Sequence, residues 1–412
     1  MKINAAKFYS SLFTVLLLLQ LYLPSFKLNL VIQIVVIAIF MFMEKTAFSV
    51  FFLKQIKPLF LLFVLGFVGA IIYRPQFFDV IRDISHYIKP ITGLLIGYLF
   101  YRRIDNAHLF FKTIVIAGVI SAIIHLGIIK VLAGTGSISE IREFTKDNFL
   151  ELFSIFVLLF YRRYTNEKLF NNIIYVAGAL LVLAISSMLY FSRTMIVLAI
   201  VMALSVFGYT IITKKTLRII VGLFVFIGLF YAYLHTANIR RNGKGFEQFL
   251  YKVKIAPEEI YKTNINLDDH RKLWDHWRAY EAGRAVHLMT EHPGSFVYGT
   301  GFGSLVNLRF FAPLTGERKG IRYISELHNG YIYIFYKVGT VGLLIYLFML
   351  GRWYRFLYRD KTFVSVMVSA TGLIFFVTTI TITGIYNNRD IIVFLLGGLL
   401  YFSERERKEI TS

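Results

Sequence analysis

The segment SELHNGYIYIFYKVGTVG, residues 325–342, decides the class of the fold. It leads into an apolar run of about 20 residues, the length of a helix that crosses a bilayer. Asn329 stands at the start of this run and is expected to cap the helix. His328 beside it is either a solvated side chain or a working group held at the boundary between lipid and water.

The composition places the whole chain in the same class. Of the 412 residues, 57% are hydrophobic, whereas soluble domains contain roughly 45–50%. The excess lies in continuous apolar blocks, which favours an all-α polytopic membrane protein over a β-barrel, whose strands alternate in polarity. The chain has no cysteine, which excludes disulfides, thiol catalysis and cysteine metal sites.

Apolar ranges predict about twelve transmembrane helices. The first contains Phe13 to Pro24 and lacks a small-residue cleavage site, so we expect it to remain uncleaved. With the N-terminus inside, every short inner loop is basic, as the positive-inside rule requires, and both termini are then cytoplasmic. The expected spans are 9–26, 28–44, 57–73, 88–101, 108–130, 148–161, 170–191, 194–213, 217–235, 329–350, 363–384 and 390–403.

One outer connection, residues 236–327, is far longer than the others. A structureless loop of this length is unusual, so we expect a folded, partly helical lid within a single membrane domain of residues 1–412. The stretch HRKLWDHWRAYEAGRAVHLMTEHP, residues 270–293, predicts a helix in that lid that ends at Pro293. Four residues fall on one face of that helix, namely Arg271, Trp274, Arg278 and Ala285.

Three arginines at the expected outer surface are candidate anion ligands, because guanidinium binds phosphate bidentately. Arg193 lies between two spans with almost no loop, where it must either snorkel or bind an anion. Arg82 lies in another expected outer loop beside Asp83, an arrangement that is more often structural. Arg278 lies on the predicted lid helix, where it could simply be solvated. We expect His86, four residues after Arg82, to be a polar surface residue.

Several glycines lie in the segment that is expected to lead from the lid back into the membrane. Gly299, Gly301 and Gly303 alternate in HPGSFVYGTGFGS, residues 292–304. Such a turn could present N–H groups to a phosphate, or could serve only as a tight turn. Gly339 and Gly342 in the tenth span are expected to admit a neighbouring helix closely.

Metal ligands are sparse in the sequence. Asp268 and Asp269 precede His270 and form a weak candidate cluster. No histidine pair has the spacing of a zinc-binding helix, so we expect neither a metal nor another cofactor.

Three motifs together resemble the bacterial O-antigen ligase/polymerase family, over roughly residues 180–350. The first is HNGYIYIFYKVGTVG, residues 328–342, which resembles the start of the helix after the family's large periplasmic loop. The second is FSRTMIVLA, residues 191–199, which is similar to a family segment that opens a transmembrane helix. The third is RAYEAGRAVHLMTEHPGSFVYGTGFG, residues 278–303. The family usually has Trp where this chain has Ala282, so Arg271 and Arg284 stay open as alternatives to Arg278.

The resemblance implies a membrane glycosyltransferase with a GT-C-like fold in the bacterial inner membrane, with its active site facing the periplasm. The implied donor is a glycan on undecaprenyl diphosphate, and the reaction is inverting and metal-independent. The acceptor hydroxyl belongs to lipid A-core in a ligase, or to another lipid-linked repeat unit in a polymerase of O-antigen or capsule. The expected partners are this donor, the glycan or lipid A-core acceptor and membrane lipid, with no nucleic acid.

The candidate residues fit that chemistry. Breaking the bond to sugar C1 puts negative charge on the diphosphate, which positive side chains must stabilise in the absence of a metal. Arg193 and Arg278 are the candidates, with Arg82 a lesser one. His328 could deprotonate the acceptor or hold the diphosphate, and Glu326 is the second candidate base.

Two other functions predict different patterns. A transporter or flippase of lipid-linked glycans predicts charges at mid-membrane on several helices. Here the charges gather at span ends, with few exceptions such as Lys112 and Lys337, and no internal repeat is evident. A non-catalytic scaffold of the envelope predicts that Arg193 and His328 are replaceable.

Overall fold

The computed structural model describes residues 4–44, 47–132, 141, 149–241, 243, 246–262, 265, 269–314, 320–388 and 390–411. Within these residues, seven helices are long and apolar enough to cross a membrane, and two shorter ones are apolar. The expected class, an all-α polytopic membrane protein, is therefore confirmed. The seven are α1 (Ala5–Tyr22), α2 (Phe26–Glu44), α3 (Val50–Tyr73), α5 (Ala107–Leu132), α10 (Lys214–Thr236), α16 (Gly330–Tyr354, continued by η1, Arg355–Tyr358) and α17 (Phe363–Thr381). The two shorter ones are α8 (Ile173–Leu189) and α9 (Arg193–Val206).

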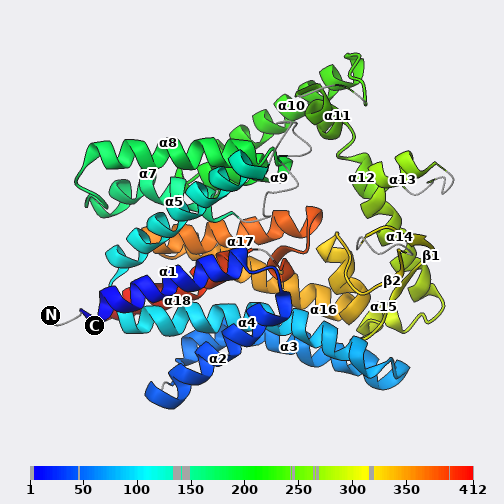
Figure 1. The fold of residues 1–412 in the computed structure, drawn as a ribbon, viewed down its shortest axis with the longest axis horizontal. Coiled ribbons are helices and arrows are strands. Elements are labelled where there is room, and N and C mark those ends of the chain that lie inside the picture. The colour runs from blue at the N-terminus through cyan, green and yellow to red at the C-terminus, as the bar shows by residue number, and fades with distance from the viewer. Residues whose placement is uncertain are drawn as a thin grey trace.

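Three further helices occupy the remaining expected ranges but are shorter or more polar. They are α4 (Phe77–Ile104), α7 (Leu150–Thr165) and α18 (Ile392–Thr411), with η2 (Gly384–Tyr386) before the last. Each of the twelve expected ranges thus overlaps a helix, while the number that span the membrane stays a prediction. Figure 1 shows both termini at one end of the bundle and the lid elements at the opposite end.

Helix α4 corrects the expectation of an outer loop around Arg82. The helix begins at Phe77, so Arg82 lies inside it. It can begin this early because its polar residues find partners on other elements: Asp83 binds Lys337, and the Lys89 ammonium donates to the Asn387 carbonyl at 2.7 Å. Buried polar groups that are paired in this way do not interrupt a helix.

The long connection 236–327, which is predicted to be a lid and is called the lid below, contains short helices and a hairpin in its described part. Its helices are α11 (Phe246–Lys254), α12 (Glu258–Tyr261), α13 (His270–Asp275), α14 (Trp277–Thr290) and α15 (Ser295–Tyr298). Strands β1 (Val306–Ala312) and β2 (Ile321–Ile324) pair antiparallel, with Val306 opposite Ile324. The expected presence of a lid helix is confirmed, and the hairpin was not predicted.

The prediction of a single helix over residues 270–293 is wrong, because the helix is interrupted at His276. His276 has a non-helical φ of −118° and ψ of 26°. Asp275, the last residue of α13, binds Arg241 at 2.8 Å and Lys252 at 2.7 Å, and both of these partners lie outside that helix. Trp274 and Arg278 therefore belong to two different helices and share no continuous face.

Helix α16 is interrupted at Gly339, which has a φ of +67° and a ψ of −170°. The break frees two carbonyl groups one turn earlier, and the glycine turn of the lid uses them. The N–H of Thr300 donates to Tyr336 at 2.8 Å, and the N–H of Gly301 donates to Lys337 at 2.9 Å. The close neighbour at Gly339 is thus the end of α15, since an added Cβ would lie 2.3 Å from the Val297 oxygen.

The glycine turn, residues 299–303, also enters a recess on α3. The Phe302 ring lies over Gly66, and the Gly301 backbone lies against Gly69. The N–H of Phe302 donates to the Gly66 carbonyl at 2.8 Å, and the N–H of Gly303 donates to Asp83 at 2.6 Å. These N–H groups bind acceptors within the protein and are not available to a phosphate. Of the two roles considered for this segment, the structure therefore favours the tight turn over the phosphate-binding loop.

Substitution of Gly301 tests this docking. Gly301→Ala is expected to destabilise the folded protein by about 2–5 kcal/mol, from backbone strain plus steric overlap. A Cβ there would lie 2.1 Å from the Ala70 nitrogen, at a φ of +82°. The measurement is thermal unfolding of detergent-purified protein. Gly228→Ala in α10 is the control, because a Cβ there meets nothing within 4 Å. Equal unfolding temperatures for the two variants would contradict the docked turn.

Candidate functional site

Helix α14 carries two candidate site residues about one turn apart. Arg278 and Glu281 have the i, i+3 spacing that puts side chains on one helix face. Arg278 reaches toward α12, and Glu281 reaches the residue pair that precedes α16. The helix thereby joins two clusters, one built on arginine and one on histidine.

The arginine cluster joins Arg193 and Arg278 through Glu259. Arg193 makes a bidentate pair with Glu259, with N–O distances of 3.1 and 3.0 Å. Arg278 Nη1 donates to Glu259 Oε2 at 2.5 Å. Two of the three arginines singled out in the sequence are therefore brought together by the fold, although they lie on different helices.

Arg193 occupies an electrostatically unfavourable position. It is the first residue of α9, where Ser192 caps the helix by accepting the Met195 N–H. A cation at a helix N-terminus is repelled by the helix dipole. Glu259 and the Lys252 carbonyl, which also accepts from Arg193, compensate for that cost. The side chain is thus held by specific acceptors and is not simply snorkelling.

A largely apolar cavity of about 600 Å³ begins at this cluster. Arg193, Glu259 and Arg278 contribute its charged groups. The other lining side chains come from α9, α10, α11, α12, α17 and the connection between α11 and α12, and they are mostly apolar, among them Ile196, Val197, Phe230, Phe246, Phe249, Leu250, Val253 and Ile260. The cavity can therefore receive an apolar chain that ends in an anion.

The second cluster is a carboxylate–histidine pair. The Glu281 side chain is only 2% exposed, and each of its oxygens lies 3.0 Å from His328 Nδ1. Glu281 also accepts the backbone N–H of His328 at 3.0 Å. The His328 side chain is 52% exposed, so the ring is held on one side and open on the other. With Nδ1 bound to Glu281, Nε2 is the nitrogen that faces away.

The Glu281 carboxylate controls the charge of His328. Burial lowers the pKa of His328, but the hydrogen bond and the negative charge of Glu281 outweigh it, so the pKa lies above its ordinary value. Asn329, next to it, caps α16 as expected by accepting the N–H groups of Tyr331 and Ile332. The cap fixes the backbone from which His328 projects.

Glu326 is held by a different histidine. Its carboxylate lies 2.8 Å from His86 Nε2, and Asn388 donates to it at 3.4 Å. Burial raises the pKa of Glu326, but the hydrogen bond and charge of His86 outweigh it, so the pKa lies below its ordinary value. A carboxylate that stays ionised in this way is a weak base. Glu326 and His328 both line a pocket of about 230 Å³ together with Asn387 and Asn388.

The expectation that His86 is polar surface is wrong. Its side chain is buried and stacks on Phe26, with ring centres 4.4 Å apart. His86 is buried because it lies inside α4 and faces Glu326 and α2.

Arg82 is not part of the arginine cluster. It pairs with Asp79 at 2.6 Å, one turn earlier on the same helix, and not with Asp83 beside it in sequence. Its side chain is half-exposed. Its positive charge still contributes to the low pKa of Glu326. Arg82 is therefore paired within its own helix.

Arg284 and Arg271 were the alternatives to Arg278. Arg284 Nε donates to the Asn307 carbonyl at 3.0 Å, on the hairpin side of α14. The side chain of Arg271 lies outside the described part of the structure. Of the two described arginines on α14, Arg278 is thus the one in the cluster.

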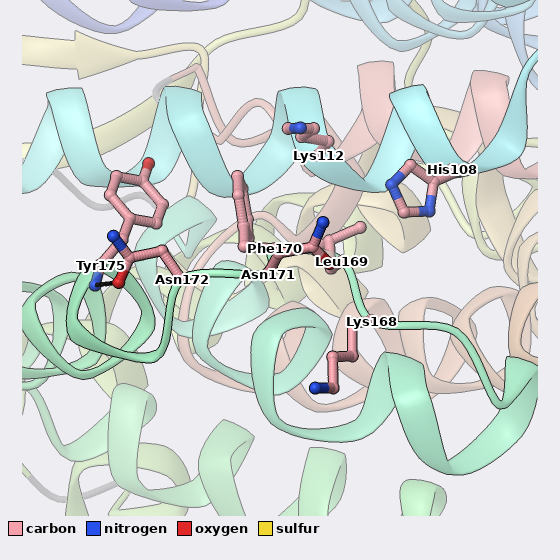
Figure 2. Close-up of a pocket in the computed structure, with 8 residues that line it drawn as sticks. All are labelled: His108, Lys112, Lys168, Leu169, Phe170, Asn171, Asn172 and Tyr175. Carbon is pink, nitrogen blue, oxygen red and sulfur yellow. Dashed lines mark hydrogen bonds between the residues drawn. The ribbon is translucent and has the colours of Figure 1, made fainter.

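The two lysines predicted inside spans have different surroundings. Lys337 is fully buried and binds Asp83 at 2.5 Å and the Ser304 carbonyl at 2.6 Å. Lys112 lies near the start of α5, 5.1 Å from the centre of the Phe170 ring. Figure 2 shows Lys112 and His108 on α5 facing the connection to α8, around a cavity of about 270 Å³. None of the predicted site residues lines that cavity.

The sequence interpretation missed the acids that organise both clusters. Glu259 and Glu281 lie far along the chain from Arg193 and His328, so no local pattern links them. The spacing of Arg278 and Glu281 was the available signal, since charged residues three apart share a helix face. Of the weak metal candidate, Asp269 caps α13 by accepting the Lys272 N–H at 3.1 Å, and Asp268 lies outside the described residues.

The raised pKa of His328 predicts a pH-dependent stability. The pair with Glu281 adds stability that is fully present below the unfolded pKa of about 6.5 and is lost as pH rises through the folded pKa. The unfolding temperature of wild type should therefore exceed that of His328→Gln, with the largest difference at about pH 5.5 and the smallest at about pH 9. The largest difference should be only a few degrees, because the ring is half-exposed and solvent screens the pair. A difference that is independent of pH would contradict the pairing.

Comparison with known families shows what the central part of the chain resembles. Residues 177–347 match the family model described as O-antigen ligase. The matched range contains both clusters, whereas Arg82 and His86 lie before it. A comparison with curated proteins gave no match. The resemblance to the O-antigen ligase family is confirmed over this domain, and together with the apolar helices it points to a multi-pass membrane protein.

Proposed function

We propose that the protein is a membrane glycosyltransferase of surface-polysaccharide assembly. It transfers a glycan from undecaprenyl diphosphate to an acceptor hydroxyl. The observation that carries this proposal is the meeting of Arg193 and Arg278 at the charged edge of an apolar cavity, one turn of α14 from the Glu281–His328 pair. That arrangement combines an anion site, a lipid site and a titratable group.

The two guanidinium groups are suited to the leaving group. As the bond between sugar C1 and the phosphate oxygen breaks, its electrons pass to the diphosphate, and fixed positive charges lower the energy of that state. Both arginines already bind a carboxylate through guanidinium N–H groups, the same groups that bind phosphate. The arginines can thus supply the charge stabilisation that other enzymes obtain from a metal.

The cavity fits the lipid part of the donor. Its walls are mostly apolar and come largely from membrane helices and from α11 and α12, at the level where α9 begins. An isoprenoid chain in this cavity would place its diphosphate at the arginine cluster. The lid, at the end of the bundle opposite both termini, then lies in the periplasm when the termini are cytoplasmic (Figure 1).

His328 is proposed as the general base. Its Nε2 takes the proton of the acceptor hydroxyl while Nδ1–H stays bonded to Glu281, which stabilises the imidazolium that forms. The acceptor oxygen attacks sugar C1 from the face opposite the diphosphate, so the anomeric centre inverts. The acceptor is the hydroxyl of lipid A-core in a ligase, or of a second lipid-linked repeat unit in a polymerase.

Replacement of the proposed charged groups tests the function. Arg193→Ala and Arg278→Ala are each expected to lower the rate of glycan transfer about 10²–10³-fold, as removal of an anion stabiliser does. His328→Ala is expected to lower it about 10²–10⁴-fold. The measurement is complementation of a deletion strain, in which surface polymer disappears and lipid-linked glycan accumulates. Single capped repeats would then indicate a polymerase, and long unattached chains a ligase.

Arg322→Ala is the matched control, because Arg322 is an exposed arginine of the same lid on β2. It should support normal polymer at equal membrane expression. Normal polymer in the three site variants would refute the transferase, and loss of lipid-linked glycan from the outer leaflet would instead support a flippase.

The pH dependence of turnover tests the role of His328. A general base must be neutral, so the rate should rise with pH through a pKa above the ordinary histidine value of about 6.5. Glu281→Gln removes the charge that raises this pKa, so the rising limb should move to lower pH and the maximal rate should fall. The measurement is transfer by purified protein between about pH 5 and 9. A rate that falls over the same limb would assign His328 to holding the diphosphate as a cation.

A further inference from the structure

We propose that Glu259 is a displaceable counter-ion, which the diphosphate of the donor replaces and which returns to the arginines when the lipid diphosphate leaves. This inference rests on the proposed function and adds a residue to it. The role differs from that of a diphosphate ligand, because Glu259 is an anion and competes with the substrate for the same donors.

The contacts of Glu259 are those that a phosphate would make. Each carboxylate oxygen accepts from Arg193, and Oε2 also accepts from Arg278. The Glu259 side chain is 9% exposed, so the pair is largely removed from water. A phosphate bound to the same guanidinium edges would have to take the position of this carboxylate.

Glu259 also stands at the entrance of the lipid position. It lies on α12, and Ala256, Pro257 and Ile260 around it line the apolar cavity with the arginines. An isoprenoid chain in that cavity would bring its diphosphate to the guanidinium groups. Entry of the donor therefore requires that α12 withdraw the carboxylate, and α12 is a single turn of four residues without a side-chain cap at its beginning.

The charges favour exchange in both directions. Without a ligand, one carboxylate offsets part of the charge of two guanidinium groups that lie mostly out of water, which avoids the cost of leaving them unpaired. The donor diphosphate carries more negative charge than one carboxylate and can replace it. After transfer, the carboxylate is at hand to compete with the product for the same N–H groups and so promotes its release.

The neighbouring acid Glu258 offers a matched control. Its carboxylate binds Lys262 at 3.0 Å and lies 3.8 Å from His276 Nε2, on α12 but away from both arginines. Glu258→Gln removes the same charge from the same helix without touching the arginine cluster.

The test is binding of undecaprenyl diphosphate to the purified full-length protein in lipid nanodiscs, together with steady-state transfer. Glu259→Gln should bind undecaprenyl diphosphate about 5–30-fold more tightly than wild type, since a competing, partly buried ion pair is removed. Its KM for donor and its kcat should both fall, because product release becomes slow. Glu258→Gln should behave as wild type, and Glu259→Asp, whose shorter carboxylate reaches the arginines less well, should shift in the same direction as Glu259→Gln.

The outcomes separate the two proposals. If wild type binds undecaprenyl diphosphate and both Glu259 variants bind it equally or more weakly, Glu259 is a structural support of the arginines and the exchange is refuted. If wild type does not bind it, and Arg193→Ala makes no difference, the proposed function fails and the exchange fails with it. The unfolding temperature of each variant is measured as well, so that binding is compared only between proteins that are folded.

Discussion

The break in α16 at Gly339 is the constraint on which the site depends. It frees the carbonyls of Tyr336 and Lys337, and the glycine turn of the lid binds them as a continuation of the interrupted helix. The Lys337 ammonium, fully buried, lies beneath that turn and binds both Asp83 and the lid carbonyl of Ser304. One buried ion pair thus links α4, α16 and the lid, and removing either charge would leave the other unpaired in a dry interior.

This anchoring explains how two distant clusters come to be adjacent. The turn fixes the chain after α14, and the Asn329 cap fixes the start of α16. Helix α14 then lies between α12 and α16, with Arg278 and Glu281 reaching to opposite partners. The separation of the arginine cluster from the histidine is therefore set by a single helical turn, a spacing that is stiff because it is covalent and hydrogen-bonded.

The sequence indicated those parts of the candidate site that have a local signal. A polar pair before an apolar run marked His328 and Asn329, and a charge between two spans marked Arg193. The partners Glu259 and Asp83 could not be predicted, because each pairing joins residues distant in sequence, and acids in a polar loop carry no local sign of burial. For Glu281 the sequence offered only its spacing of three residues from Arg278, which does not name His328 as its partner. The same reason explains why the start of α4 was predicted too late. Its polar residues indicate a loop until it is known that Asp83 pairs with Lys337 and that Lys89 donates to the Asn387 carbonyl.

The two acids of the candidate site have different contacts, and these contacts suit the different roles proposed for them. Glu281 binds both the ring and the backbone N–H of His328, so it cannot leave without unpairing a main-chain group, and it is suited to a permanent role. Glu259 binds the side-chain N–H groups of arginines, which an incoming phosphate can satisfy equally well, so its departure leaves no donor unpaired. A binding site for a dianion that must be stable when empty needs such a replaceable anion, whereas a histidine that must keep one tautomer needs a fixed one.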